Sequence, residues 1–307
     1  MAFNKIECFK IQIMKTKNDN ILDIHNYEPV HQIMCDKANF INEPVIIVAD
    51  PFLFVHNGRL YLFYEQKKLY HNGVLMMTST SDLDIWSEPV VVLKEDFHLS
   101  YPWVFKDNGH VYMVPESCED ASIRLYEANN DKLDSFSLVK KLLKQPYIEN
   151  ITMSFADTSI FKENNIYYLH TTICVNGVNQ LRLYYADNLF GPYIEHTRSP
   201  IIISVKYGRN AGNLFKWNDM LLRPAQDCES RYGDNVHLMK VENMTTEEYE
   251  EILYKEYIID SDMDFYREGG HQYNLAAFRG YTVLATDAKE YHNYFFNRFM
   301  HKFGKYK

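Results

Sequence analysis

One sequence pattern recurs five times along this 307-residue chain. Each copy is an apolar stretch containing a shared phenylalanine, then a short polar turn, then a second apolar stretch. The shared residues are Phe54, Phe105, Phe161, Phe215 and Phe278. Their separations of 51, 56, 54 and 63 residues are close to the period of the repeats that build propeller blades.

The polar turns have the chemistry of two-residue hairpin turns. Asn-Gly occupies 57–58 and 108–109, Asn-Asn occupies 164–165, and Asn-Asp occupies 218–219. Both central residues of such a turn take positive φ, which these residue types tolerate. A third alternating strand follows several copies, as in "QLRLYYAD", and an outer strand such as "IWSEPVVVL" often comes next. Four strands in each of five units predict an all-β fold, a five-bladed β-propeller. Hairpins alone would also allow a large sandwich or barrel.

The predicted domain organisation is a single propeller over residues 1–287 and a tail over 288–307. We expect the N-terminal strand "ECFKIQIM" to close the ring by pairing with the last blade. The segment 245–257 mixes glutamates with apolar residues and is interpreted as a surface helix or a connection between blades. The aromatic, basic tail is predicted to be a short amphipathic C-terminal helix. The sequence leaves open whether that helix contacts a membrane surface, a partner or the outside of the propeller.

Composition and charge exclude several classes of function. A net charge of −9 argues against a basic surface that recruits nucleic acid. The chain has no apolar run of the length that spans a membrane. Its N-terminus alternates polar and apolar residues, as a strand does, and lacks the continuous apolar segment of a signal peptide. The five cysteines are widely spaced with no CxxC pair, so neither a zinc knuckle nor a disulfide framework is predicted. The simplest setting is cytoplasmic.

The first strand of each blade lines the central channel of a propeller, so its first residues should converge. With the phenylalanines as register, the equivalent residues are Asp50, Tyr101, Asp157, Ala211 and Asn274. Two carboxylates in one narrow funnel push their pKa values apart, as a general acid–base pair requires. The alternative interpretation is structural: Asp50 and Asp157 cap strand ends or bind a backbone amide of the neighbouring blade.

Several motifs together resemble a known family. "ADPFLF" and "FADTSIF" are similar to the blade starts of the arabinanase, levansucrase and invertase superfamily of five-bladed propellers that act on glycosidic bonds. A closer resemblance, from about residue 45 to 280, is to the N-terminal domain family of glucosamine inositolphosphorylceramide transferase and its bacterial relatives. The motifs that carry it are "SYPWVF", "MVPES", "LFGPY", "GRNAGNLF", "RPAQDC", "RYGDNVHLMKV" and "GGHQYN".

The resemblance to the hydrolases implies roles for the carboxylates. Asp50 matches their general base and Asp157 their pKa-tuning aspartate. Their general acid is a Glu that opens the fourth blade, where this chain has "GRNAGN" instead. Because hydrolysis normally needs two carboxyl groups, Asp157, Glu116 or Asp227 would have to replace that acid. No convincing DxD-like motif is present, so no metal and no cofactor is predicted.

The remaining motif residues suit the binding of a sugar or of a phosphate. Hydrogen-bond donors are supplied by Arg209, Asn210, Arg223 and Gln226. Aromatic faces for a sugar ring are offered by Tyr101, Trp103, Tyr232 and Tyr273. His271 can act as acid, base or phosphate partner. For Arg223, a buried ion pair with Asp227 is an equal alternative to contact with a ligand. Trp103 is interpreted as a core residue in preference to a binding residue.

Three functions follow from these residues and from the resemblance. The first is a glycosyltransferase of cell-surface polysaccharide or glycolipid synthesis, in which Asp50 deprotonates the acceptor and arginines stabilise the departing phosphate of a nucleotide-sugar or lipid-linked donor. The second is a furanosidase-type glycoside hydrolase. The third is a non-catalytic glycan-binding module that serves a partner transferase. All three place a sugar or glycan at the propeller axis.

Overall fold

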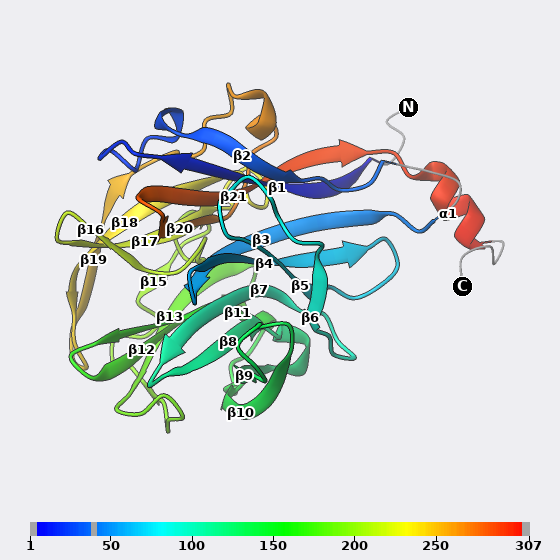
Figure 1. Cartoon of the computed structure of the whole chain (residues 1–307). Coiled ribbons are helices and arrows are strands. Elements are labelled where there is room, and N and C mark those ends of the chain that lie inside the picture. The colour runs from blue at the N-terminus through cyan, green and yellow to red at the C-terminus, as the bar shows by residue number, and fades with distance from the viewer. Residues whose placement is uncertain (1–4, 38–41, 303–307) are drawn as a thin grey trace.

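The chain forms five antiparallel sheets arranged as the blades of a propeller, in a computed structural model that describes residues 5–37 and 42–302 (Figure 1). The predicted five-bladed β-propeller is therefore confirmed. Within the described residues, no helix is both long enough and apolar enough to cross a bilayer.

The first four blades are each built from consecutive strands, with the first strand innermost. Blade 1 contains β3 (Val45–His56), β4 (Arg59–Lys68), β5 (Val74–Thr80) and β6 (Val90–Leu93). Blade 2 contains β7 (Ser100–Asp107), β8 (His110–Glu116), β9 (Ser122–Ala128) and β10 (Phe136–Lys144). Blade 3 contains β11 (Ile151–Glu163), β12 (Ile166–Val175), β13 (Val178–Ala186), β14 (Ile194–Glu195) and β15 (Ile202–Ile203). Blade 4 contains β16 (Phe215–Trp217), β17 (Met220–Asp227), β18 (Asn235–Met244) and β19 (Tyr249–Lys255).

Blade 5 draws its strands from both ends of the chain. Its order is β20 (Tyr273–Phe278), β21 (Tyr281–His292), β1 (Ile6–Thr16) and β2 (Glu28–Ile33). The pairing of β1 with β21 runs from Ile6 opposite His292 to Thr16 opposite Thr282. The prediction that the N-terminal strand closes the ring is confirmed.

The hairpin turns between the first and second strands have the predicted backbone conformation. Asn57 and Gly58 have φ values of 47° and 73°. Asn164 and Asn165 have φ values of 50° and 64° without a glycine, because asparagine tolerates the left-handed region better than most residues. These turns fix the register of each inner strand, and with it the side chains that reach the axis.

One of the predicted local structures is wrong, because residues 249–255 form β19, the outer strand of blade 4, where a helix or a connection was expected. The predicted short C-terminal helix is confirmed as α1 (Phe295–Lys302). It begins later than residue 288, because residues 288–292 continue β21; residues 303–307 lie outside the described residues. Short 3-10 turns occur at Ile24–Asn26, Cys118–Asp120 and Asp264–Tyr266.

The apolar core lies between neighbouring blades. Phe63 of blade 1 packs in one cluster with Met113 and Tyr126 of blade 2, and Leu62 of blade 1 shares another with Ile11 and Val283 of blade 5. Burial of each such side chain contributes roughly 1.5–3 kcal/mol. Because the apolar faces pack blade against blade, the polar side chains at the inner strand ends are left to meet at the axis.

Candidate functional site

Three inner strands share an unusual backbone feature where they approach the axis. The pairing of β3, β7 and β11 with their neighbours is interrupted at the same register, after Ala49, Ser100 and Ala156. The following residues Asp50, Tyr101 and Asp157 have φ values of 53°, 46° and 50°. Residues other than glycine pay roughly 1–2 kcal/mol for this left-handed conformation, and such strain concentrates at functional sites.

The interruption frees backbone N–H groups, and carboxylates of neighbouring blades accept from them. The Asp50 amide donates to Asp287 Oδ2 over 3.1 Å, and the Tyr101 amide donates to Asp50 Oδ2 over 3.0 Å. The Asp157 amide donates to Glu116 Oε2 over 3.1 Å. The blade-to-blade amide contact considered as the alternative role of Asp50 is therefore present, and it uses only one of its two oxygens.

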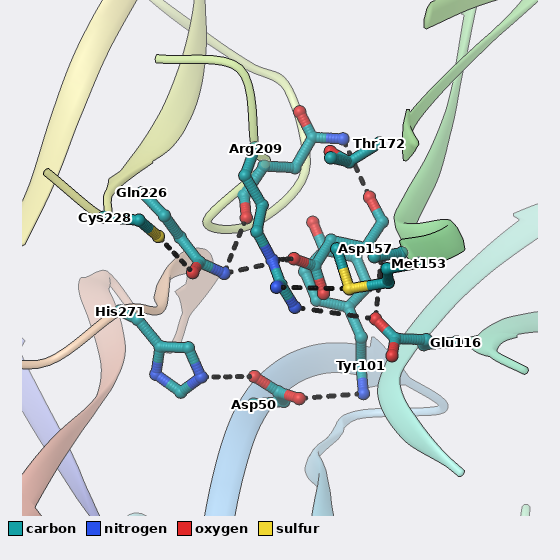
Figure 2. A network of polar contacts seen from close by, with 12 residues as sticks. Asp50, Tyr101, Glu116, Met153, Asp157, Thr172, Arg209, Gln226, Cys228 and His271 are labelled. Atoms are coloured by element: carbon teal, nitrogen blue, oxygen red, sulfur yellow. Dashed lines mark hydrogen bonds and ion pairs between the residues drawn. The ribbon is translucent and has the colours of Figure 1, made fainter. Parts of the chain in front are cut away.

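All five blades contribute charged side chains to one network, which we call the central cluster (Figure 2). Its members are Asp50, Glu116, Asp157, Arg209, His271 and Asp287. All but Arg209 are buried, and the Arg209 side chain is 11% exposed. Buried charges must be paired, and here each carboxylate lies beside a cation or accepts a backbone N–H.

His271 joins two carboxylates of blades 1 and 5. Its Nδ1 lies 2.8 Å from Asp287 Oδ2, and its Nε2 lies 3.3 Å from Asp50 Oδ1. Burial alone would lower the pKa of His271, but the charges of Asp287 and Asp50 outweigh it and raise that pKa to about 9. His271 is therefore an imidazolium at neutral pH, with a proton on the nitrogen that faces Asp50.

The two aspartates beside His271 differ in their affinity for a proton. Burial raises the pKa of Asp50 well above its usual range, and His271 only partly opposes this effect. Burial would also raise the pKa of Asp287, but His271 and backbone N–H donors hold it below its usual range. Asp287 is thus the permanent counter-ion of His271, and Asp50 is the carboxylate able to exchange a proton.

Arg209 lies on the other side of the cluster, against Asp157 and Glu116. Its guanidinium forms an ion pair with Asp157 and lies 3.8 Å from Glu116 Oε2. Gln226 Nε2 donates to Asp157 Oδ2 over 3.1 Å, and Asn210 Nδ2 donates to the Asp157 carbonyl over 2.8 Å. Burial and the charge of Asp157 raise the pKa of Glu116 to about 7. Glu116 therefore carries a proton for part of the time at neutral pH.

Tyr232 is the most accessible of the predicted site residues that contact the cluster. It is 39% exposed, its ring lies 5.1 Å from Arg209 Cζ, and its centroid lies 5.1 Å from that of His271. A tyrosine ring presents both an apolar body and a polar hydroxyl. Tyr232 therefore gives the cluster a partly exposed aromatic neighbour.

Arg223 and Asp227 are committed to partners elsewhere. Arg223 is fully buried and pairs with Glu251, with Nε 2.8 Å from Oε2, so the predicted bridge to Asp227 is wrong. Asp227 Oδ2 instead lies 3.0 Å from His237 Nε2. Alternation along β17 explains both placements, because side chains of odd number point away from the face on which Gln226 reaches Asp157.

Three of the four predicted aromatic residues pack inside the protein. Tyr273 is 1% exposed and belongs to an apolar core cluster, so the expectation that it offers a face to a sugar ring is wrong. Tyr101 is fully buried; its hydroxyl accepts from the Gly212 amide over 3.1 Å, and its ring meets Phe52 edge-on. No face of Tyr101 is open to a sugar ring, so that expectation is wrong. Trp103 packs against Phe52 and Phe105, in agreement with its interpretation as a core residue.

Sequence reasoning missed Asp287, which links blades 1 and 5 at the site. It binds His271 through its side chain and accepts from the amides of His271, Gln272 and Asp50. A signal was present, since Asp287 is the single charge in the sequence stretch "YTVLATDA" of residues 281–288. The weak fifth repeat gave no register for the second strand, so this charge could not be assigned to the axis.

The fold is a five-bladed propeller, and several solved glycoside hydrolases have a similar fold. One solved structure of similar fold is a family 117 glycoside hydrolase from Zobellia galactanivorans, with a TM-score of 0.56, 12% identity, and coverage of 83% of this chain and 87% of that one. Another is an α-L-arabinofuranosidase from Clostridium thermocellum, with a TM-score of 0.54, 16% identity, and coverage of 76% and 80%. At these identities the similarity concerns the fold alone.

The chain belongs to the family described as glucosamine inositolphosphorylceramide transferase 1, N-terminal, whose model matches residues 6–275. The protein of that name from Oryza sativa subsp. japonica is 35% identical over 217 residues, covering 68% of this chain and 28% of the relative. The one from Arabidopsis thaliana is 34% identical over 234 residues, covering 73% and 29%. The chain spans less than a third of the length of these relatives.

Proposed function

We propose that the central cluster binds a sugar and catalyses glycosyl transfer in the synthesis of a cell-surface polysaccharide or glycolipid. The observation that carries this proposal is the chain Asp287–His271–Asp50, in which a buried imidazolium holds a carboxylate at the axis. The family relatives support it, because they are named glucosamine inositolphosphorylceramide transferase 1.

Asp50 is the proposed general base. The acceptor hydroxyl loses its proton to Asp50 as its oxygen bonds to the anomeric carbon of the donor, while the bond from that carbon to the leaving oxygen breaks. The raised pKa of Asp50 makes it a better base than an exposed aspartate. His271 and Asp287 position Asp50 and stabilise its charge before the proton arrives.

Arg209 and Glu116 are the proposed groups on the leaving side. Arg209 occupies the start of the fourth blade, and its guanidinium can stabilise the negative charge of a departing phosphate. Glu116, with a pKa of about 7, can donate a proton to a departing oxygen. The ion pair with Asp157 holds the guanidinium in place between the two carboxylates.

Two other functions each have one observation in their favour. Hydrolysis is favoured by Glu116, an acid of raised pKa beside Asp157 in a propeller that resembles glycoside hydrolases; water would then replace the acceptor. A glycan-binding role beside a separate transferase is favoured by length, since the chain matches less than a third of the named relatives.

The first test is a thermal-shift screen against nucleotide sugars, free nucleotides and neutral oligosaccharides. A ligand that binds only the folded state raises Tm in proportion to its saturation. Stabilisation by a nucleotide sugar supports transfer and identifies a donor for turnover assays with glycan or lipid acceptors. Stabilisation by neutral oligosaccharides alone would contradict transfer from a nucleotide-sugar donor and leave hydrolysis or binding, which product analysis separates.

The decisive variant is Asp50→Asn, because asparagine keeps an oxygen for the Tyr101 amide and loses the base. We expect turnover to fall by at least about 100-fold while the ligand-induced shift in Tm remains. Asp227→Asn is the matched control, since Asp227 is a buried carboxylate paired with His237; its turnover should stay close to that of the wild type. Equal turnover in Asp50→Asn and the wild type would overturn the proposed role of Asp50.

A further inference from the structure

A second group of ligating side chains lies where the ring of blades closes. Cys35, Glu290 and His292 each offer one ligand atom, and these atoms all lie within 4.8 Å of one another. Cys35 Sγ donates to Glu290 Oε1 over 2.8 Å, and His292 Nε2 lies 2.7 Å from the same oxygen. His292 is five residues beyond Asp287 along β21, or roughly 16 Å at the rise of a strand. The group is therefore separate from the central cluster.

Cys8 is a second thiol beside this group. It is fully buried on β1 directly opposite Glu290, although its sulfur is not among the atoms that lie within 4.8 Å of one another. The four side chains come from three segments that are distant in sequence: β1, the stretch after β2, and β21. Lys10 Nζ lies 3.3 Å from Glu290 Oε2, so it holds the second carboxylate oxygen and leaves Oε1 to the Cys35 thiol and the His292 imidazole.

We propose that Cys8, Cys35, Glu290 and His292 bind a zinc ion. Two sulfurs, one imidazole nitrogen and one carboxylate oxygen are ligand types of a tetrahedral zinc site. Soft sulfur donors disfavour calcium and magnesium, which take oxygen ligands. Zinc would replace the proton through which Cys35 now binds Glu290, and both thiols would lose their protons to solvent on binding.

The competing chemistry for two thiols beside Glu290 is a disulfide between Cys8 and Cys35. A disulfide would not account for the position of Glu290 and His292 beside Cys35. A metal ion would bind all four side chains. The proposed ion would tie β1 and the stretch after β2 to β21, and so stabilise the closure of the ring. It would not take part in chemistry at the axis.

The experiment uses the full chain, purified under reducing conditions, stripped with a chelator and titrated with Co²⁺ and then with Zn²⁺. We expect one ion per chain, an absorption band from thiolate-to-cobalt charge transfer, and loss of that band when zinc displaces cobalt. Cys35→Ser and His292→Gln should each weaken zinc affinity by at least about 100-fold. His292 is partly exposed, so its variant should fold, and circular dichroism checks this.

Matched controls are Cys174→Ser and Cys228→Ser, which remove half-buried thiols elsewhere in the chain. Both should bind cobalt with the spectrum and affinity of the wild type. Cobalt binding without the charge-transfer band, or binding that survives both Cys35→Ser and His292→Gln, would overturn the proposal. A reduced wild-type chain that takes up no zinc would also overturn it. Mass spectrometry of a sample purified without reductant then shows whether Cys8 and Cys35 form a disulfide instead.

Discussion

At the scale of single residues, the site depends on how one imidazole is shared between two carboxylates. Asp287 fixes Nδ1 of His271, and Nε2 faces Asp50 at 3.3 Å. The pKa of His271, about 9, lies above that of an unfolded histidine. The folded state thus holds this proton more tightly than the unfolded state does, and folding stability depends on pH through it.

This linkage predicts the pH dependence of stability. The contribution of His271 is fully present below about pH 6.5 and is lost as the pH rises through about 9. Its size is roughly 3 kcal/mol. Urea unfolding of the wild type and His271→Gln should give curves of unfolding free energy against pH that converge between these values. His25→Gln, which removes a surface pair with Asp260, should keep a constant small difference from the wild type. A constant difference for His271→Gln would contradict the shared proton.

The sequence allowed part of this residue-level picture to be predicted. Asp50 and Asp157 were placed at the axis by their distance from a repeated phenylalanine, since strand register fixes which side chains converge. Asp287 was not found, because it lies on a second strand and its role depends on a contact with His271, which precedes β20. Contacts of that kind arise from packing between elements and leave no local pattern.

At the scale of elements, strand alternation decides which polar residues reach the axis. Gln226 of β17 points to the central cluster, whereas Arg223 of the same strand points to Glu251 of β19. Both members of the Arg223–Glu251 pair have side chains with no exposed surface. Removal of one member of a buried ion pair leaves the other charge without compensation, which is strongly destabilising.

Glu251→Ala is therefore expected to lower the free energy of unfolding by about 3–5 kcal/mol. The loss arises from a buried guanidinium that is left without a carboxylate partner in blade 4. Glu195→Ala is the comparison, because Glu195 pairs with Arg182 but is 38% exposed; its cost should stay below about 1 kcal/mol. Chemical denaturation measures both. Similar values for the two variants would show that Arg223 finds another partner.

The strand β19 also explains a failure of sequence reasoning. Its glutamates favour a helix by intrinsic propensity. Pairing with β18 and burial of Glu251 against Arg223 override the propensity. The hairpins with Asn-Gly turns were predicted correctly because their signal is local, while an outer strand is defined by its neighbour.

At the scale of the whole molecule, the two ends of the chain complete the same blade (Figure 1). The strand β1 buries Ile11, Ile13 and Met14 completely while it pairs with β21. Loss of one buried residue of this size costs about 2–5 kcal/mol, and a domain has only about 5–15 kcal/mol in total. Ring closure is thus required for a folded state.

A chain that begins at residue 42, and so lacks β1 and β2, is expected to lose the cooperative thermal transition and to aggregate through the exposed edge of β21. A chain that ends at Tyr294 removes α1 but keeps the pairing of β1 with β21. It should unfold cooperatively at a Tm close to that of the full chain. Scanning calorimetry distinguishes the two outcomes, and a cooperative transition in the first chain would contradict the requirement for closure.

The antiparallel contact between Ile6 and His292 also has a consequence for protein engineering. Because β21 ends beside the start of β1, a short loop could join them as a hairpin, and new ends could be opened between β2 and β3. Every blade of that circular permutant would be a continuous piece of chain. The catalytic residues proposed for the axis would keep their positions, so the order in which the strands of blade 5 are connected serves folding and not the reaction.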